Sequence, residues 1–249
     1  MDVERDAIRK DVETFDGGLE WGRVTAHARK VIIVACGPSL RQIQLSRLLE
    51  DDLKDAYVIA VNRAHDWLPQ MDAFFTLDPN EWFHEMAFNR MRPNVTYYVG
   101  VPEDYGQMDA RMYTHRVPVA RGPIYLHRVT GGGFMRSKRR LCTKTDSIHT
   151  GNSAYGALGI AFHLCRAHPE LYVQKKILFL GLDGTRQKYA YGDQGPLGSL
   201  SHLPMLFQST RKQLEDNRIA VVNASKHSSV DCFSRMGAGD ALEWLSKDD

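Results

Sequence analysis

The sequence contains little cysteine and no long apolar run. Its cysteines, at positions 36, 142, 165 and 232, are scattered without a C-x-x-C pair, which indicates neither a zinc site nor a disulfide framework. Its apolar runs fall well short of the roughly 18 residues that a membrane-spanning helix needs. The polar start Met-Asp-Val-Glu-Arg also lacks the apolar core of a secretion signal. We therefore expect a cytoplasmic protein without a membrane span.

Charge imbalance is also nearly absent. The chain has 32 basic and 30 acidic side chains, a formal charge of +2, so net charge does not predict a polyanionic partner. Its 249 residues, 43% of them hydrophobic, are typical of an ordinary globular protein. We expect a charged helical arm over residues 1–29, followed by one large domain over residues 30–249.

The prediction of the fold starts from residues 30–40, Lys-Val-Ile-Ile-Val-Ala-Cys-Gly-Pro-Ser-Leu. The β-branched run that ends at Ala35 suits a strand buried on both faces, as in a parallel sheet. The apolar residues after Leu40 fall near a helical period, and Ser39 would cap the start of that helix. Backbone N–H groups at a helix start attract phosphate, so this turn is either a ligand site or an ordinary structural connection.

Further buried strands are expected at residues 57–61, 73–77, 95–99, 177–180 and 219–223. Several of these strands are followed by polar side chains, namely Asn62, Asp78, Asn80 and Asp183. In open α/β sheets the ligand lies outside the carboxyl ends of the strands. We therefore expect these side chains and Gly37 to face one crevice.

The segment 150–184 contains a second candidate ligand site. Thr150-Gly151-Asn152-Ser153 precedes a helix whose small and apolar residues repeat at helical spacing as far as Cys165. Small residues on one helix face allow close packing on a sheet, whereas the polar start is expected to face a ligand. Further helices are predicted from about 203 to 217 and over 239–245.

Residues 100–149 and 185–200 are rich in glycine and short of periodic apolar positions, which predicts loops and a flexible lid. The first of these segments contains a basic cluster, made of Arg136, Lys138, Arg139 and Arg140. This cluster is either a solvated face or a set of phosphate contacts to nucleic acid.

Taken in order, these motifs resemble the Campylobacter-type bacterial sialyltransferases and the related 6-hydroxymethylpterin diphosphokinase-like family. The resemblance rests on Val-Ile-Ile-x-x-x-Gly-Pro-Ser-Leu, Asn62, Thr-Gly-Asn-Ser and Leu-Gly-Leu-Asp-Gly, and it covers about residues 30–225. It implies an α/β, Rossmann-like catalytic domain, with a mostly parallel sheet flanked by helices and a flexible lid. It also implies a glycosyltransferase that uses a nucleotide-activated sugar, such as a CMP- or UDP-sugar, without an obligatory metal or other cofactor.

By position, the resemblance implies that the donor is bound by Cys36, Gly37, Pro38, Ser39, Asn62, Asp78, Asn80, Thr150, Gly151, Asn152, Ser153, Gly181 and Gly184. Two of these residues depart from the sialyltransferases, because Cys36 and Asp78 each stand where that family has an asparagine. Thr185 likewise replaces one of the family's two phosphate-stabilising tyrosines. The donor therefore need not be CMP-sialic acid.

The catalytic group implied by the resemblance consists of His202, Asp183 and Tyr191, to which we add Arg186. Histidine titrates near neutrality, so His202 would take the proton from the acceptor hydroxyl, unless it is merely a helix-end residue. Tyr191 and Arg186 would stabilise the departing phosphate, and Asp183 would lie beside the donor sugar.

Several alternatives remain open at this stage. The acceptor would be a saccharide, another hydroxyl compound or a hydroxymethylated base of DNA, as in phage-type DNA modification, where the basic cluster would contact phosphates. The diphosphokinase-like relatives suggest instead a transfer of pyrophosphate from ATP, which would normally use Mg²⁺. A nucleotide-binding regulatory module is the non-enzymatic alternative. The sequence is compatible with an oligomer.

Overall fold

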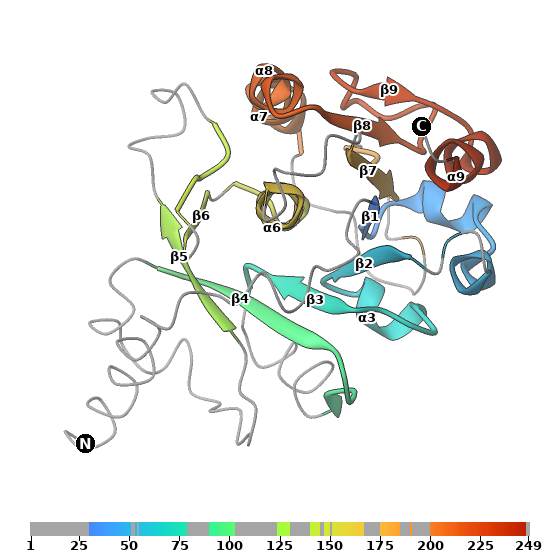
Figure 1. The fold of residues 1–249 in the computed structure, drawn as a ribbon, viewed down its shortest axis with the longest axis horizontal. Helices are drawn as coiled ribbons and strands as arrows, with labels where there is room; N and C mark the ends of the chain where they lie inside the picture. The colour runs from blue at the N-terminus through green and yellow to red at the C-terminus, as the bar shows by residue number, and fades with distance from the viewer. Residues whose placement is uncertain are drawn as a thin grey trace.

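The computed structural model describes residues 30–50, 53, 55–78, 90–102, 124–129, 140–144, 147–149, 151–166, 175–184, 190 and 200–247. These residues form an α/β, Rossmann-like fold with helices on both faces of one sheet (Figure 1). The described part of the sheet has nine strands in the order β6-β5-β4-β3-β2-β1-β7-β8-β9, and every pairing is parallel.

The strands are β1 Lys30–Val34, β2 Ala56–Val61, β3 Ala73–Thr76, β4 Thr96–Pro102, β5 Ile124–Val129, β6 Ser147–His149, β7 Lys175–Leu180, β8 Ile219–Asn223 and β9 Ser234–Arg235. The chain builds the sheet outward from β1 to β6, returns to place β7 beside β1, and then continues the other way. The order of strands therefore reverses between β1 and β7. In open α/β sheets, the crevice at such a reversal is where ligands bind.

The six strands that the sequence predicts are confirmed as β1, β2, β3, β4, β7 and β8, with ends shifted by a few residues at most. The central pair explains why the prediction succeeds. Val31 to Val34 in β1 and Ile177 to Leu180 in β7 have no exposed surface, because both strands have neighbours on each side and layers of side chains above and below. An uninterrupted apolar run is what that environment requires.

Helix α6, Ser153–Arg166, packs on one face of the sheet together with α7, Leu203–Gln208, and α8, Arg211–Asp216. The small residues of α6 serve this packing, as the sequence predicts. A β-carbon at Gly156 would lie 2.5 Å from the ring of Phe75 in β3, so a larger residue would push the helix away. The opposite face is covered by α3, Ala64–Trp67, and α9, Ala238–Ser246. Helix α9 confirms the short terminal helix.

The predicted helix after β1 is wrong in type. The chain forms two 3₁₀ segments, η2 Pro38–Gln42 and η3 Leu45–Leu49, and Gly37 rather than Ser39 is the first cap residue. Two short turns still bury Leu40 and Leu48 against the sheet, so the apolar spacing is satisfied without an α-helix. The backbone N–H of Ser39 is bound by a side chain from the turn after β7, which ties this segment to the sheet.

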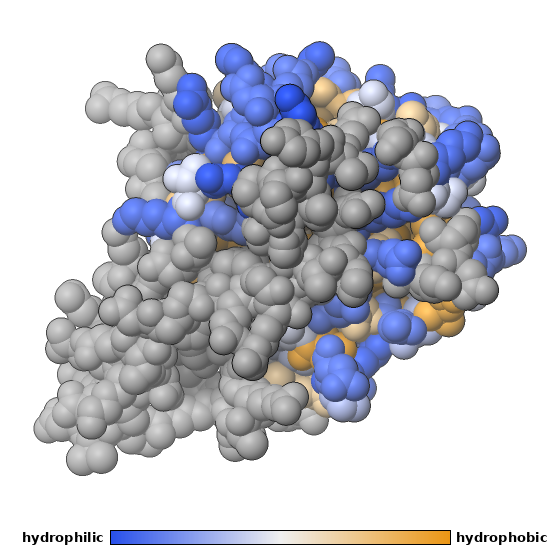
Figure 2. All heavy atoms as spheres, in the orientation of Figure 1, coloured by the Kyte–Doolittle hydropathy of each residue, from blue (hydrophilic) through white to orange (hydrophobic). Residues whose placement is uncertain are grey.

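The predicted helix over 203–217 is interrupted at Ser209 and Thr210, which separate α7 from α8. Their hydroxyl groups donate to the carbonyls of Leu206, at 2.7 Å, and Phe207, at 2.8 Å. Serine and threonine can bond to the backbone in this way and so compete with helix formation. The outer surface of α8 carries the ion pairs Arg211–Glu215 and Lys212–Asp216, and the top edge of the molecule is hydrophilic there (Figure 2).

The expectation of loops over 100–149 is wrong for part of that segment. Strands β5 and β6 lie within it and extend the sheet beyond β4, with Tyr98 opposite Ile124 and His127 opposite Ser147. Residues 103–123, 130–139 and 145–146 of the predicted lid lie outside the described residues, as do the arm over 1–29 and most of the loop over 185–200. None of the helices that the structure describes is long and apolar enough to cross a membrane.

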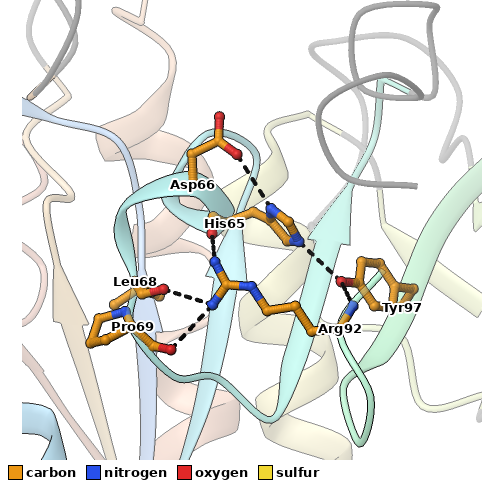
Figure 3. A network of polar contacts seen from close by, with 6 residues as sticks. All are labelled: His65, Asp66, Leu68, Pro69, Arg92 and Tyr97. Carbon is orange, nitrogen blue, oxygen red and sulfur yellow. Dashed lines mark hydrogen bonds and ion pairs between the residues drawn. The ribbon is translucent and has the colours of Figure 1, made fainter. Parts of the chain in front are cut away.

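A buried polar network joins α3 to β4 on the face opposite α6 (Figure 3). The backbone N–H of Arg92 donates to the hydroxyl oxygen of Tyr97, at 2.9 Å, and that hydroxyl lies 3.0 Å from Nε2 of His65. The hydroxyl can donate to Nε2 or accept from it, depending on the tautomer of His65. The Arg92 guanidinium binds the carbonyls of His65 and Leu68 at the end of α3, both at 2.7 Å.

This geometry holds His65 in its neutral form. Burial, and after it the charge of Arg92, lowers the pKa of His65 below its ordinary value of 6.5, although Asp66 acts in the opposite direction. Protonation of His65 is therefore easier in the unfolded chain than in the folded protein.

We predict that the free energy of unfolding falls as the pH is lowered from about 6.5, the pKa of histidine in the unfolded chain, towards the lower pKa of His65 in the folded protein. The total loss is about 1.4 kcal/mol for each pH unit that separates these two pKa values. The sign follows because the unfolded chain binds more protons in this range. His65→Gln, which keeps an acceptor for Tyr97 but does not titrate, should lose this part of the slope. Urea denaturation at pH 7 and pH 5 measures it, and equal slopes in the two proteins would contradict the assignment.

Candidate functional site

A pocket of about 400 Å³ lies at the carboxyl ends of the central strands, where the strand order reverses. It is lined by residues from the turns after β1, β2, β3 and β7, from β5, from the start of α6 and from the approach to α7. These residues are Ala35, Cys36, Gly37, Val61, Asn62, Leu77, Asp78, Arg128, Gly151, Asn152, Ser153, Ala154, Gly181, Leu182, Asp183, Gly184, Leu200 and Leu203. The expected grouping of Gly37, Asn62, Asp78 and Asp183 around one crevice is confirmed.

The turns after β1 and β7 are bonded to each other at the centre of this pocket. The N–H of Gly37 donates to the carbonyl of Gly181, at 2.8 Å, and the N–H of Ser39 donates to Oδ2 of Asp183, also at 2.8 Å. A β-carbon at position 37 would collide with the Asp183 carboxylate and lie 2.5 Å from the Gly181 oxygen. Glycine is therefore required at position 37 by the close approach of the two turns.

Asp183 connects three segments of the wall. Its Oδ2 accepts from Ser39, its Oδ1 accepts a hydrogen bond from the hydroxyl of Ser225, and its carbonyl accepts from the N–H of Ser229, at 2.9 Å. The residue is buried. Asp183 lines the pocket, but its carboxylate is engaged on both oxygens with the protein, which makes it a group that positions the turn after β1.

Asn62 is the polar residue at the end of β2. It adopts a left-handed backbone conformation, with φ 52°, which asparagine tolerates better than most residues. Its side-chain nitrogen donates to Oγ of Ser153, at 3.3 Å, and this bond ties β2 to the start of α6. Its Oδ1 is buried without a hydrogen-bond partner among the described residues, so a donor group on a ligand would satisfy it.

Helix α6 begins at the wall of the pocket. Oδ1 of Asn152 accepts from the N–H of Ala154, at 2.8 Å, so Asn152 caps this helix with its side chain. Gly151, with φ 138°, turns the chain into the cap. The start of a helix of 14 residues therefore faces the pocket with its positive dipole end, which favours an anionic ligand group.

Cys36 lines the pocket, and its thiol is bonded to the backbone of β2. Its thiol donates to the carbonyl of Val61, at 3.2 Å, and burial raises its pKa to about 12. Because only a thiolate attacks carbon or binds metal well, this cysteine is inert near neutral pH.

Asp78 and Arg128 occupy the part of the pocket wall formed by β3 and β5. Loss of water around the carboxyl group raises the pKa of Asp78, which Arg128 opposes by its charge, although Asp78 keeps an exposed surface. Arg128 donates from Nε to the carbonyl of Gly100 in β4, at 2.9 Å. Arg128 was not predicted from the sequence as a site residue. It lies two positions after the buried Leu126 and therefore on the same face of β5. A charged residue on the same strand face as a core residue is the signal that points to such a site.

His202 immediately precedes α7 as its cap residue and lies beside the pocket rather than among its lining residues. Its Nε2 lies 3.1 Å from the carbonyl of Gly151. A carbonyl only accepts, so Nε2 carries the proton in this contact. Its neighbours Leu200 and Leu203 both line the pocket, so His202 is anchored at the rim between α6 and α7.

The structure brings together most of the predicted donor residues, but not all of them. Pro38 and Ser39 follow Gly37 in the turn without lining the pocket. Asn80, Thr150, Arg186, Tyr191, Arg136, Lys138 and Arg139 lie outside the described residues. Of the basic cluster only Arg140 is described, and it is exposed.

Within the described ranges, no group of three histidine, cysteine, aspartate or glutamate side chains is placed to hold a metal ion. Comparison of the chain with protein-family models, with curated proteins and with solved structures finds no match.

Proposed function

We propose that the protein is a glycosyltransferase that moves a sugar from a nucleotide sugar to an acceptor hydroxyl. The observation that carries this proposal is the pocket at the β1/β7 reversal, whose wall combines the Gly37 turn, the Gly181 to Gly184 turn and the start of α6. This is the position at which Rossmann-like folds bind nucleotides.

The polar groups of the pocket suit the two parts of a nucleotide. The unpartnered Oδ1 of Asn62 would accept from a base amino group or a ribose hydroxyl. The start of α6 would attract the phosphate, and its N–H groups would stabilise the charge that develops as the phosphate leaves. Tyr191 and Arg186 are proposed to add to that stabilisation.

His202 is proposed as the base that takes the proton from the attacking hydroxyl. Support for this role comes from its position at the pocket rim, where the contact of Nε2 with the Gly151 carbonyl holds the imidazole ring. Transfer of that proton, attack on the anomeric carbon and departure of the nucleotide would complete one turnover.

The acceptor is proposed to be a saccharide or another hydroxyl compound. Among the described residues, no specific observation favours transfer to a DNA base or transfer of pyrophosphate from ATP over this acceptor.

A thermal-shift screen tests the proposal. CMP-, UDP- and GDP-sugars are compared, without Mg²⁺, with ATP in the presence and absence of Mg²⁺. A ligand at 100 times its Kd stabilises by about 2.7 kcal/mol, which corresponds to a rise in Tm of roughly 5 to 10 °C for a chain of this size. We expect that rise with a sugar nucleotide alone, followed by its turnover with a hydroxyl acceptor. Stabilisation by ATP only, and only with Mg²⁺, would overturn the proposal in favour of a diphosphokinase.

A further inference from the structure

Arg128 lies at the end of the pocket farthest from the β1/β7 reversal. Its strand, β5, is four places from β1 in the sheet, which at about 4.8 Å between neighbouring strands amounts to roughly 19 Å. A nucleotide centred on the turns after β1 and β7 therefore leaves this end for another part of the substrate. Arg128 is the basic residue among those that line the pocket.

The backbone holds the Arg128 side chain across the neighbouring strand. Its Nε donates to the carbonyl of Gly100 in β4, and a β-carbon at Gly100 would lie 3.6 Å from that Nε and 2.5 Å from the Leu77 side chain. The close contact at position 100 is therefore with Leu77, whereas the distance to Arg128 is an ordinary van der Waals contact. The bond from Nε uses one of the five N–H donors of a guanidinium.

The terminal nitrogens of Arg128 make no hydrogen bond and no ion pair with the described residues. Asp78 is close enough to act on Arg128 through its charge, but the two do not form an ion pair. The pocket wall therefore contains a planar group with paired donors, which is held at Nε and whose terminal nitrogens have no partner among the residues that the structure describes. Paired donors of this kind match two oxygens of a carboxylate or a phosphate.

We propose that Arg128 forms an oxyanion subsite, which binds two oxygens of a phosphate or carboxylate group of the substrate. The inference deepens the proposed function and rests on it for the placement of the nucleotide. The anion is either a phosphate of the donor that reaches across the pocket, or an acidic group on the sugar or acceptor. In both cases Arg128 determines specificity by rejecting uncharged analogues, because their binding would leave the guanidinium desolvated without a partner.

Isothermal titration calorimetry on matched ligands tests this subsite. The first arm compares UDP with uridine and CMP with cytidine, the second compares glucuronate with glucose, and the third uses inorganic pyrophosphate alone. Arg128→Gln is expected to lower the affinity for the bound anion by roughly 10- to 100-fold and not to lower the affinity for its uncharged partner, which should rise as the desolvation penalty is removed. Arg128→Lys keeps the charge but not the paired donors, so its affinity for the anion should lie between that of the wild type and that of Arg128→Gln.

Arg211→Gln is the matched control, since it makes the same change at an exposed residue of α8 outside this pocket. The Tm of each variant shows whether it is folded. The proposal is overturned if Arg128→Gln, folded, binds every anion as tightly as the wild type, or if the wild type binds none of them. If pyrophosphate or glucuronate binds in an Arg128-dependent way while no nucleotide or sugar nucleotide binds, the subsite stands and the proposed function fails.

Discussion

Replacement of His202 by alanine is expected to lower turnover by roughly 10²- to 10⁴-fold, the usual contribution of a positioned general base. Donor affinity should change little, because His202 lies beside the pocket rather than among its lining residues. Single-turnover kinetics with saturating donor measures the chemical step, and calorimetry measures the affinity.

His202→Gln distinguishes a general base from a residue that only anchors α7 to the start of α6. The amide nitrogen of the introduced glutamine can replace the Nε2 donor to the Gly151 carbonyl, but the side chain cannot accept a proton near neutral pH. If His202 is the base, the glutamine variant is as slow as the alanine variant. If the histidine only anchors α7 to the start of α6, glutamine restores most of the turnover and the alanine variant loses stability instead.

Gly37→Ala is expected to have the largest effect on both stability and ligand binding. The new methyl group would collide with Asp183 and with the Gly181 carbonyl, and neither backbone turn can move without breaking a 2.8 Å hydrogen bond. We expect a loss of about 1 to 3 kcal/mol in unfolding free energy, typical of overpacking, and a donor affinity too weak to measure at the concentrations that saturate the wild type. Urea denaturation and calorimetry measure the two effects.

Gly239→Ala provides the control for this change. Residue 239 lies in α9, and a β-carbon there would have no atom within 4 Å, so alanine should leave the stability unchanged or raise it by up to about 1 kcal/mol. If Gly37→Ala behaves like Gly239→Ala, the turns after β1 and β7 do not approach each other closely, and ligand binding in the pocket does not depend on their contact.

The sheet was predictable from the sequence because its central strands are buried on both faces. Such strands need apolar runs, and a run as short as Val31 to Val34 suits a buried strand better than a buried helix. The shared edge was predictable for a related reason, since parallel strands bring their carboxyl ends together and polar residues there have a common location.

The local structure after β1 was not predictable, because a long-range bond decides it. Apolar spacing from Leu40 onward fits an α-helix, whereas the chain forms two 3₁₀ segments there, the first of which is bonded through the N–H of Ser39 to Asp183, a residue 144 positions later in the chain. Arg128 was missed for a similar reason. Its segment looks irregular in isolation, and it becomes part of the pocket because β4 and β5 pair and because Nε of Arg128 bonds to the Gly100 carbonyl.

We propose that the pocket at the β1/β7 reversal binds the nucleotide. Hydrogen–deuterium exchange, measured with and without the sugar nucleotide that gives the largest thermal shift, tests it directly. A second groove of about 460 Å³, lined by residues such as Leu214, Phe233 and Trp244, serves as the internal comparison. We predict slower exchange in residues 36–40, 151–156 and 181–184, with no change over 211–216 and 231–236. Protection confined to the second groove, with the first pocket unaffected, would contradict nucleotide binding at the β1/β7 reversal.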